Sequence, residues 1–255
     1  MLDALFFGAH PDDVELSSGG LAALLAAHGH VVGIADLTRG EKGTRGDVEE
    51  RSAEAADAAR ELGVTWRGNL GLPDLGLDRH DHGQQAAVVA CLREHRPRLV
   101  VAPDPDDAHP DHVEASRLVE RACYLAGLAR FAASPGPAGD APGGSSAGGP
   151  PRHRPERLLF ALYRGAARPH LVVDVSAAWE RRMRAVRVHR SQLDPARGPA
   201  TYLTEPGFLE EIEARARSLG ALIGARYGEG YRVRGPVPVT DARTLLSSGL
   251  KGGVQ

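Results

Sequence analysis

Short apolar runs alternate with helical segments along the first half of the chain, and this alternation limits the fold more than any other feature. The apolar runs cover residues 2–8, 31–37, 64–66 and 99–102, and the predicted helices cover residues 16–28, 49–62, 84–95 and 113–128. In the second of these helices, small apolar residues form one stripe that ends before Gly63. Strands and helices alternating in this way predict a Rossmann-like parallel sheet with helices on both faces.

The second half of the chain continues the same domain after an interruption. Of the 18 residues from 134 to 151, 14 are Gly, Pro or Ser. Such a segment cannot bury a core, and we predict a flexible insertion there. Apolar strands resume at 158–163 and 171–175, and helices at 177–188 and 208–225 complete a C-terminal α/β extension. We therefore expect one domain over residues 1–235 and a C-terminal tail over residues 236–255.

Composition argues against several classes of protein. The formal charge is −2, so we expect no nucleic-acid partner and no binding to an anionic membrane. No apolar run approaches the ~18 residues of a membrane span, and the polar residues from His10 onward interrupt the N-terminal run before it could serve as a signal peptide. Cys91 and Cys123 lie in helical patterns, where we expect small reduced core residues. The expected location is the cytoplasm.

Two polar clusters follow the first and fourth predicted strands. The first, GAHPDD at residues 8–13, stands where a dinucleotide-binding fold would carry its glycine-rich loop, but its carboxylates disfavour a pyrophosphate and suit a divalent cation. The second is HPDH at residues 109–112. In a sheet of order 3-2-1-4-5, strands one and four are neighbours, and ligands bind between their C-terminal ends. We therefore expect the two clusters to meet in one crevice.

The side chains in these clusters predict a catalytic metal site. His10, Asp13 and His112 would supply three ligands and leave one position open, a count typical of catalytic zinc. Either cluster alone could instead be a simple turn whose aspartate caps a helix. Two clusters at adjacent strand ends favour the metal.

The remaining polar residues of the clusters have distinct predicted tasks. Asp12 would act as general base on the metal-bound water. His109 would donate a proton or a hydrogen bond to the developing oxyanion. Asp111 would orient a histidine, or would only cap the helix that begins near Val113. Arg51 belongs to the solvated first turn of a predicted helix, although the loop after strand two could bring it over the crevice.

The chain resembles the PIG-L/LmbE-type zinc-dependent de-N-acetylases, and most closely their bacillithiol-biosynthesis subgroup. The strings FGAHPDDVELSSGG, DLTRGEKGTRG, NLGLPD, HPDHVEASRLVE, HRPERLLF, LVVDVSAAWE and YGEGY carry this resemblance over most of residues 2–235. It implies an LmbE-like fold and hydrolysis of N-acetylglucosaminyl-malate to the free amine and acetate. It also implies one Zn²⁺ per subunit, with Fe²⁺ as an alternative, and a homo-oligomer, often a hexamer.

The resemblance assigns the same site residues as the spacing does. It implies that His10, Asp13 and His112 bind zinc, that Asp12 is the base and that His109 stabilises the oxyanion. It adds Arg51 as a residue that contacts the substrate, an amino-sugar, at an anionic part.

Other functions stay open at this point. Within the hydrolases, the substrate could be another amino-sugar or a thiol conjugate cleaved by an amidase. Two histidines and one carboxylate also describe non-haem iron enzymes, although these usually place the triad in a β-barrel. A non-enzymatic Rossmann-like binding module would bind no metal.

Overall fold

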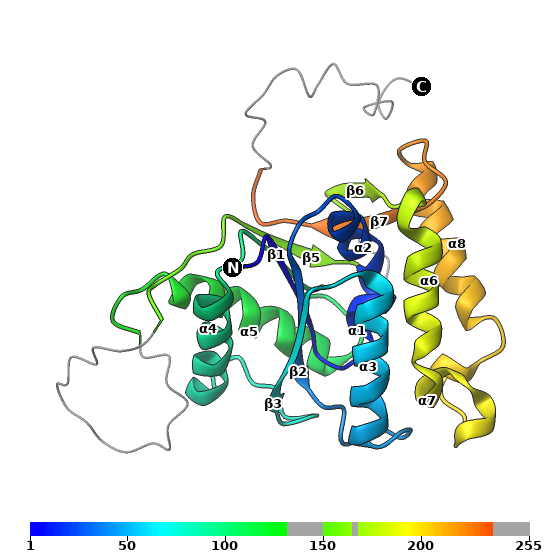
Figure 1. The fold of residues 1–255 in the computed structure, drawn as a ribbon, viewed down its shortest axis with the longest axis horizontal. Helices are drawn as coiled ribbons and strands as arrows, with labels where there is room; N and C mark the ends of the chain where they lie inside the picture. The colour runs from blue at the N-terminus through cyan, green and yellow to red at the C-terminus, as the bar shows by residue number, and fades with distance from the viewer. Residues whose placement is uncertain (132–149, 165–167, 237–255) are drawn as a thin grey trace.

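The computed structural model describes residues 1–131, 150–164 and 168–236, which form one sheet between two layers of helices (Figure 1). The insertion predicted over 134–151 lies outside the described residues except for its last two positions. The predicted tail over 236–255 lies outside them except for its first position.

The sheet has seven strands among the described residues, in the order β3-β2-β1-β4-β5-β7-β6. They are β1 (Ala4–Gly8), β2 (Val32–Thr38), β3 (Trp66–Leu72), β4 (Leu99–Pro103), β5 (Arg157–Ala161), β6 (Leu171–Asp174) and β7 (Gly228–Arg232). The first five strands pair in parallel, with β1 between β2 and β4. The predicted order 3-2-1-4-5 is confirmed, and so is the predicted fold class.

Helices cover both faces of the sheet, as predicted (Figure 1). The described helices are α1 (Asp13–Ser17), α2 (Gly19–Ala27), α3 (Val48–Leu62), α4 (His82–His95), α5 (Pro110–Ala126), α6 (Trp179–Val188), α7 (Arg190–Leu193) and α8 (Phe208–Ala221), with short 3₁₀ turns η1 (Ser176–Ala178), η2 (Pro195–Arg197) and η3 (Tyr202–Thr204). Because side chains alternate along β1, Leu5 and Phe7 pack in the core under α4 and α5, while Phe6 packs in the core under α2, α3 and α6.

Several elements differ from the sequence prediction. Strand β7 is absent from that prediction, and it pairs antiparallel with both β5 and β6, so the sheet is parallel only over its first five strands. The helix predicted at 16–28 is broken at Ser18 into α1 and α2. The third strand covers residues 66–72, whereas the prediction is 64–66. The helix predicted to begin at Val113 begins at Pro110.

Strand β7 is tied to the opposite end of the chain by Glu229. This buried carboxylate accepts hydrogen bonds from the backbone N–H groups of Gly20 and Leu21, at 2.7 and 2.8 Å, in the first turn of α2. It also lies 3.2 Å from Arg182 Nη1. A Cβ at Gly20 would stand 2.6 Å from Glu229 Oε1, so the close approach requires glycine. The contact satisfies helix N–H groups that have no partner within the helix.

We expect Glu229→Ala to lower the free energy of unfolding by about 3–5 kcal/mol, because the buried Arg182 guanidinium loses its carboxylate. Urea unfolding followed by circular dichroism measures the change. The control is Glu61→Ala, which removes an exposed partner of Arg184 and should cost about 1 kcal/mol or less. Equal effects of the two substitutions would contradict the assigned role of Glu229.

Both cysteines are free, as predicted. Cys91 is buried in the core under α4 and α5, and Cys123 packs against that core. Burial raises the pKa of both thiols to about 12.

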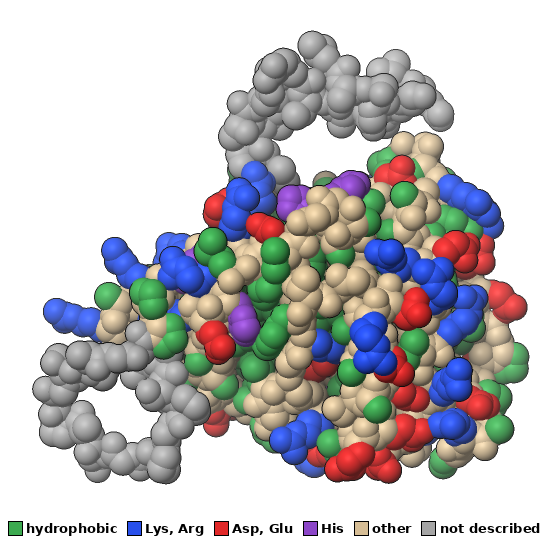
Figure 2. Space-filling view, viewed as in Figure 1, with side chains coloured by type: hydrophobic (Ala, Val, Ile, Leu, Met, Phe, Trp, Pro, Cys, Tyr) green, Lys and Arg blue, Asp and Glu red, His purple; other side chains and the backbone are tan. Residues whose placement is uncertain are grey.

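Over the described ranges, no helix combines the length and the apolar character needed to cross a bilayer. On the face seen in Figure 2, basic and acidic side chains of the described residues are interspersed.

Candidate metal centre and active site

The two predicted polar clusters meet at the C-terminal ends of β1 and β4. His10 follows β1, and His109 and His112 lie at the start of α5, which follows β4. The ring centroid of His10 is 5.0 Å from that of His109 and 5.6 Å from that of His112. The crevice expected from the strand order therefore exists, and three imidazoles line it.

Asp13 lies between two of these imidazoles. Its Oδ1 is 3.1 Å from His112 Nε2, and its Oδ2 is 3.5 Å from His10 Nδ1. The backbone N–H of His10 also donates to Asp13 Oδ2, at 2.8 Å, which fixes the carboxylate. Two donors that bind one zinc ion tetrahedrally at ~2.0–2.1 Å are separated by roughly 3.3 Å. Asp13 therefore lies near this spacing from both imidazoles, and the predicted ligand set His10, Asp13 and His112 has the donor types that a divalent ion takes.

A carboxylate lies behind each imidazole, on the side away from Asp13. His10 Nε2 is 3.2 Å from Asp74 Oδ1 and 3.4 Å from Asp111 Oδ2. His112 Nδ1 is 3.2 Å from Asp107 Oδ1. Metal-binding histidines characteristically donate their second ring N–H to such a carboxylate, which fixes the tautomer and the ring orientation. This arrangement leaves His10 Nδ1 and His112 Nε2 to face Asp13.

The charges of the cluster are strongly coupled. Burial alone would lower the pKa of His112, but Asp13 and Asp107 raise it to about 10. Burial would raise the pKa of Asp13, but His112 and His10 hold it well below its usual range. The carboxylates therefore require compensating positive charge, which protons on the imidazoles or a bound cation can supply.

Two other donor sets of the described residues have all their ligand atoms close together, and the set with Asp13 is not one of them. Ligand atoms of His10, His109 and His112 lie within 4.8 Å of one another, and so do those of His10, Asp74 and Asp111. We favour the set with Asp13, because its carboxylate contacts both imidazoles and would neutralise part of the charge of a divalent ion.

Asp74→Asn should weaken metal binding about 10- to 100-fold, because the amide cannot accept the His10 N–H as a carboxylate does. Competition with a fluorescent chelator measures the dissociation constant. The matched control is Asp78→Asn, an exposed position in the same turn region, which should leave the constant unchanged. An unaltered constant in Asp74→Asn would show that this carboxylate does not support a metal ligand.

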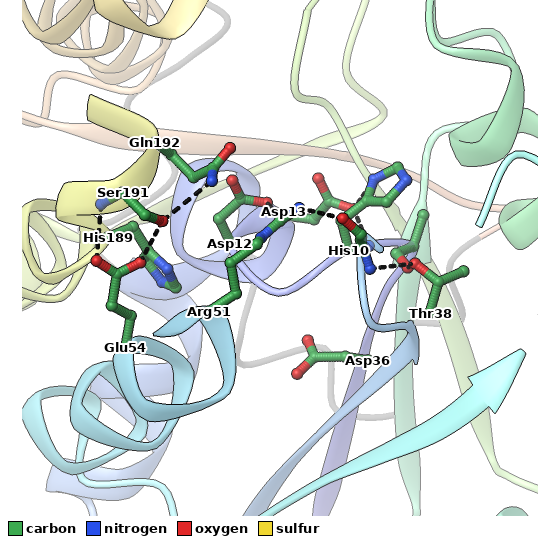
Figure 3. A network of polar contacts seen from close by, with 12 residues as sticks. His10, Asp12, Asp13, Asp36, Thr38, Arg51, Glu54, His189, Ser191 and Gln192 are labelled. Carbon is green, nitrogen blue, oxygen red and sulfur yellow. Dashed lines mark hydrogen bonds and ion pairs between the residues drawn. The ribbon is translucent and has the colours of Figure 1, made fainter. Parts of the chain in front are cut away.

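Asp12 is buried beside Arg51 at the start of α1. Arg51 Nη2 lies 3.6 Å from Asp12 Oδ1, and Arg51 Nη1 donates to the carbonyl of Gly40 at 3.1 Å (Figure 3). Gly40 has φ +64°, and a Cβ there would stand 2.0 Å from Arg51 Nη1, so the residue must be glycine. Arg51 lines the cavity but is only 4% exposed. The observed contacts make it a partner of Asp12, and its contact with substrate stays a prediction.

His109 caps helix α5. Its Nδ1 accepts the backbone N–H of Asp111 at 3.2 Å, so His109 and not Asp111 is the capping residue. An Nδ1 that accepts a hydrogen bond carries no proton, and Nε2 must then carry it. Burial and the positive charges of His112 and His10 lower the pKa of His109. The Nε2–H is therefore the ring group that His109 has left to donate.

A cavity of about 520 Å³ opens over the cluster. One wall is held by a chain of hydrogen bonds from α3, in which Glu54 accepts from Ser191 Oγ at 2.6 Å and Ser191 Oγ accepts from Gln192 Nε2 at 3.0 Å. Figure 3 shows this chain on one side of Arg51 and the side chains of Asp13 and His10 on the other. The wall thus brings residues of α7 next to the strand-end cluster.

Sequence reasoning did not identify Asp74 and Asp107. Asp107 belongs to an acidic run that directly precedes the second cluster, which was a usable signal. Asp74 ends the string NLGLPD and reaches His10 only because β3 lies two strands away from β1 in the sheet. No spacing along the chain could indicate that contact.

Comparison with known proteins gives a consistent family match. The family model described as PIG-L, GlcNAc-PI de-N-acetylase, matches residues 5–123. Diacetylchitobiose deacetylase from Thermococcus kodakarensis is 32% identical over 233 residues, which cover 88% of this chain and 79% of that protein. A 1D-myo-inositol 2-acetamido-2-deoxy-alpha-D-glucopyranoside deacetylase from Rhodococcus opacus is 36% identical over 162 residues, which cover 50% of this chain and 55% of that protein.

Among solved structures, the conserved protein TT1542 from Thermus thermophilus has a similar fold. The TM-score is 0.80 at 38% identity, and the alignment covers 94% of this chain and 98% of that one. The match extends through the antiparallel end of the sheet, well beyond the residues that the family model covers.

Proposed function

The chain belongs to the PIG-L family of de-N-acetylases, and on this premise we propose that it is a metal-dependent hydrolase that removes the acetyl group from an N-acetylglucosamine-containing substrate. The observation that carries the proposal is the position of Asp13 between two imidazoles, each with a carboxylate behind it. Three such ligands with an open position are typical of catalytic metal centres.

His10 Nδ1, a carboxylate oxygen of Asp13 and His112 Nε2 would hold the ion, with Zn²⁺ as the proposed metal and Fe²⁺ as the alternative. When bound, it would polarise the acetamide carbonyl and lower the pKa of a bound water to ~7. Asp74, Asp111 and Asp107 would keep the two imidazoles in the binding tautomer.

We propose that Asp12 moves the proton. Its carboxylate lies next to Asp13 in the chain and lines the same cavity, so it can accept a proton from the attacking water. The nearby Arg51 guanidinium holds the carboxylate in position. The proton that Asp12 accepts can then pass to the leaving amine, which restores the carboxylate.

We propose that His109 stabilises the negative charge that develops on the substrate. With Nδ1 engaged by the backbone of Asp111, its Nε2–H is the group left to donate to the acetyl oxygen as that oxygen becomes negative. This donation would need no positive charge on the ring.

We further propose N-acetylglucosaminyl-malate as the substrate, with bacillithiol biosynthesis as the context. The resemblance of the motif strings over residues 2–235 supports this choice. The relatives named above act on diacetylchitobiose and on an inositol-linked acetamidoglucoside, according to their names, and these compounds are the competing substrates.

The test is acetate release by metal-analysed protein from the malate-, inositol- and chitobiose-linked substrates. We expect release that requires metal, with the largest kcat/KM for the malate-linked compound. A larger value for either competitor would refute the malate assignment. A failure to release acetate from all three would refute the proposed activity.

The homo-oligomer, hexameric by resemblance, and the cytoplasmic location stay predictions. Light scattering of the purified chain tests the first, and fractionation of the source cells tests the second.

A further inference from the structure

The cavity contains a cationic side chain that has no role in the mechanism proposed above. Arg164, which follows β5, lines the same cavity as Asp12 and His112. Its guanidinium lies over the ring of Tyr202, with the central carbon 3.7 Å from the ring centroid. Among the ion pairs of the described residues, none includes Arg164, and the carboxylate of Glu211 in this region pairs with Arg215 at 2.7 Å.

The ring of Tyr202 is the platform beneath this arginine, and several contacts hold it in place. The hydroxyl of Tyr202 donates to Glu211, and the ring of Tyr202 packs edge-on against Phe208 with centroids 5.3 Å apart. Arg215 ties the platform to the carbonyl of Tyr163. Stacking engages the face of a guanidinium and leaves its edge N–H groups available, so a planar carboxylate can bind them in bidentate fashion.

A second cation lines the cavity. Lys42 belongs to the loop after β2, and its backbone N–H donates to Asp74 Oδ2 at 2.8 Å. That bond fixes its backbone next to the metal cluster, while no ion pair of the described residues uses its side chain. Of the acidic side chains that line the cavity, Asp13, Asp74 and Asp107 contact the two metal-facing imidazoles, and Asp12 pairs with Arg51.

Neither Arg164 nor Lys42 has a carboxylate partner among the ion pairs of the described residues, so both can offer positive charge to a ligand in a cavity of about 520 Å³. Such charges favour an anionic ligand. The guanidinium of Arg164 favours a carboxylate in particular, because its N–H groups match the two carboxylate oxygens.

We propose that Arg164, held flat on Tyr202, is a specificity-determining residue that binds a carboxylate on the aglycone of the substrate, with Lys42 as a second contact. This inference rests on the proposed deacetylase function and extends it, because it assigns residues that select acidic over neutral aglycones. The sugar would present its acetamide to the metal cluster while the acidic aglycone contacts the arginine.

The experiment uses two substrates that differ in charge and little in shape: N-acetylglucosaminyl-malate and its dimethyl ester. Acetate release by the metal-loaded full chain is measured for the unaltered protein, for Arg164→Gln and for the control Arg168→Gln. Arg168 is an exposed arginine near the same strand that does not line the cavity. Lys42→Gln serves as a second variant.

We expect the unaltered protein to prefer the diacid. Arg164→Gln should lower kcat/KM for the diacid about 10- to 100-fold, mainly through KM, since charge-assisted hydrogen bonds contribute on this scale. The diester should change less than about twofold, because it offers no carboxylate to lose. Lys42→Gln should act in the same direction with a smaller factor, and Arg168→Gln should change neither substrate.

A preference for the diester, or an equal loss on both substrates in Arg164→Gln, would overturn the inference while the deacetylase activity stands. An effect on kcat alone would also overturn it, since it would indicate disturbed chemistry instead of lost binding. Absence of acetate release from both substrates would overturn this inference. Release from the inositol- or chitobiose-linked compound by the same preparation would then show that the proposed deacetylase activity stands.

Discussion

Asp12→Ala will retain its metal and lose about 10²–10⁴ of its turnover, the range expected when a positioned proton acceptor is removed. The Asp12 carboxylate contacts Arg51, whereas the imidazoles of His10 and His112 contact Asp13 and other carboxylates. Substitution of Asp12 therefore leaves the proposed ligands in place and removes the group that takes the proton from water. Acetate release at saturating substrate, normalised to bound metal, measures the effect.

Asp12→Asn provides the sharper variant, because it keeps the size of the side chain and removes its basicity. It should lose turnover to a similar extent with little change in KM. Normal turnover in either variant with metal bound would remove Asp12 from the mechanism. Loss of metal in both variants would place Asp12 among the ligands.

His112→Ala will lose the metal itself, and with it essentially all activity. The imidazole is buried and lies between Asp13 and Asp107, at 3.1 and 3.2 Å. Its removal deletes one of three proposed ligands and leaves two carboxylates without their shared partner. Elemental analysis after dialysis should show a metal content of less than about one-tenth of that of the unaltered protein, given the dependence of structured metal sites on every ligand.

The control for this variant is His80→Ala, an exposed histidine in the loop before α4, which should keep its metal and its activity. Circular dichroism of both variants separates loss of metal from loss of fold. Full metal content in His112→Ala would refute its role as a ligand and would favour the donor set of His10, Asp74 and Asp111.

The sequence was sufficient to predict the part of the fold that positions the site. Alternating apolar runs and helices determined the order of the first five strands, and that order brought residues 8–13 and 109–112 to one crevice. Those predictions succeeded because each depends on local patterns and on a general rule about parallel sheets.

The antiparallel strand β7 could not be predicted in the same way. Its sequence, GEGYR, is short, contains two glycines and lacks an apolar run. It forms a strand because Glu229 anchors it to α2, and because β5 and β6 offer it two pairing edges. Tertiary contacts determine this strand, and local propensity does not.

The supporting carboxylates escaped prediction for a related reason. Asp74 follows β3, and it meets His10 through the arrangement of three strands. His109 caps α5 because its Nδ1 accepts the Asp111 N–H. The spacing of residues along the chain does not decide whether His109 or Asp111 is the cap. Residues within one cluster were predictable, whereas contacts between distant segments required the structure.

The most direct test of the central claim is anomalous diffraction from crystals of the zinc-loaded protein, recorded on both sides of the zinc absorption edge. We expect one strong anomalous peak per chain, within ~2.0–2.2 Å of His10 Nδ1, an Asp13 oxygen and His112 Nε2. A peak bound instead by Asp74 and Asp111, or a cluster without any peak, would contradict the assigned metal centre.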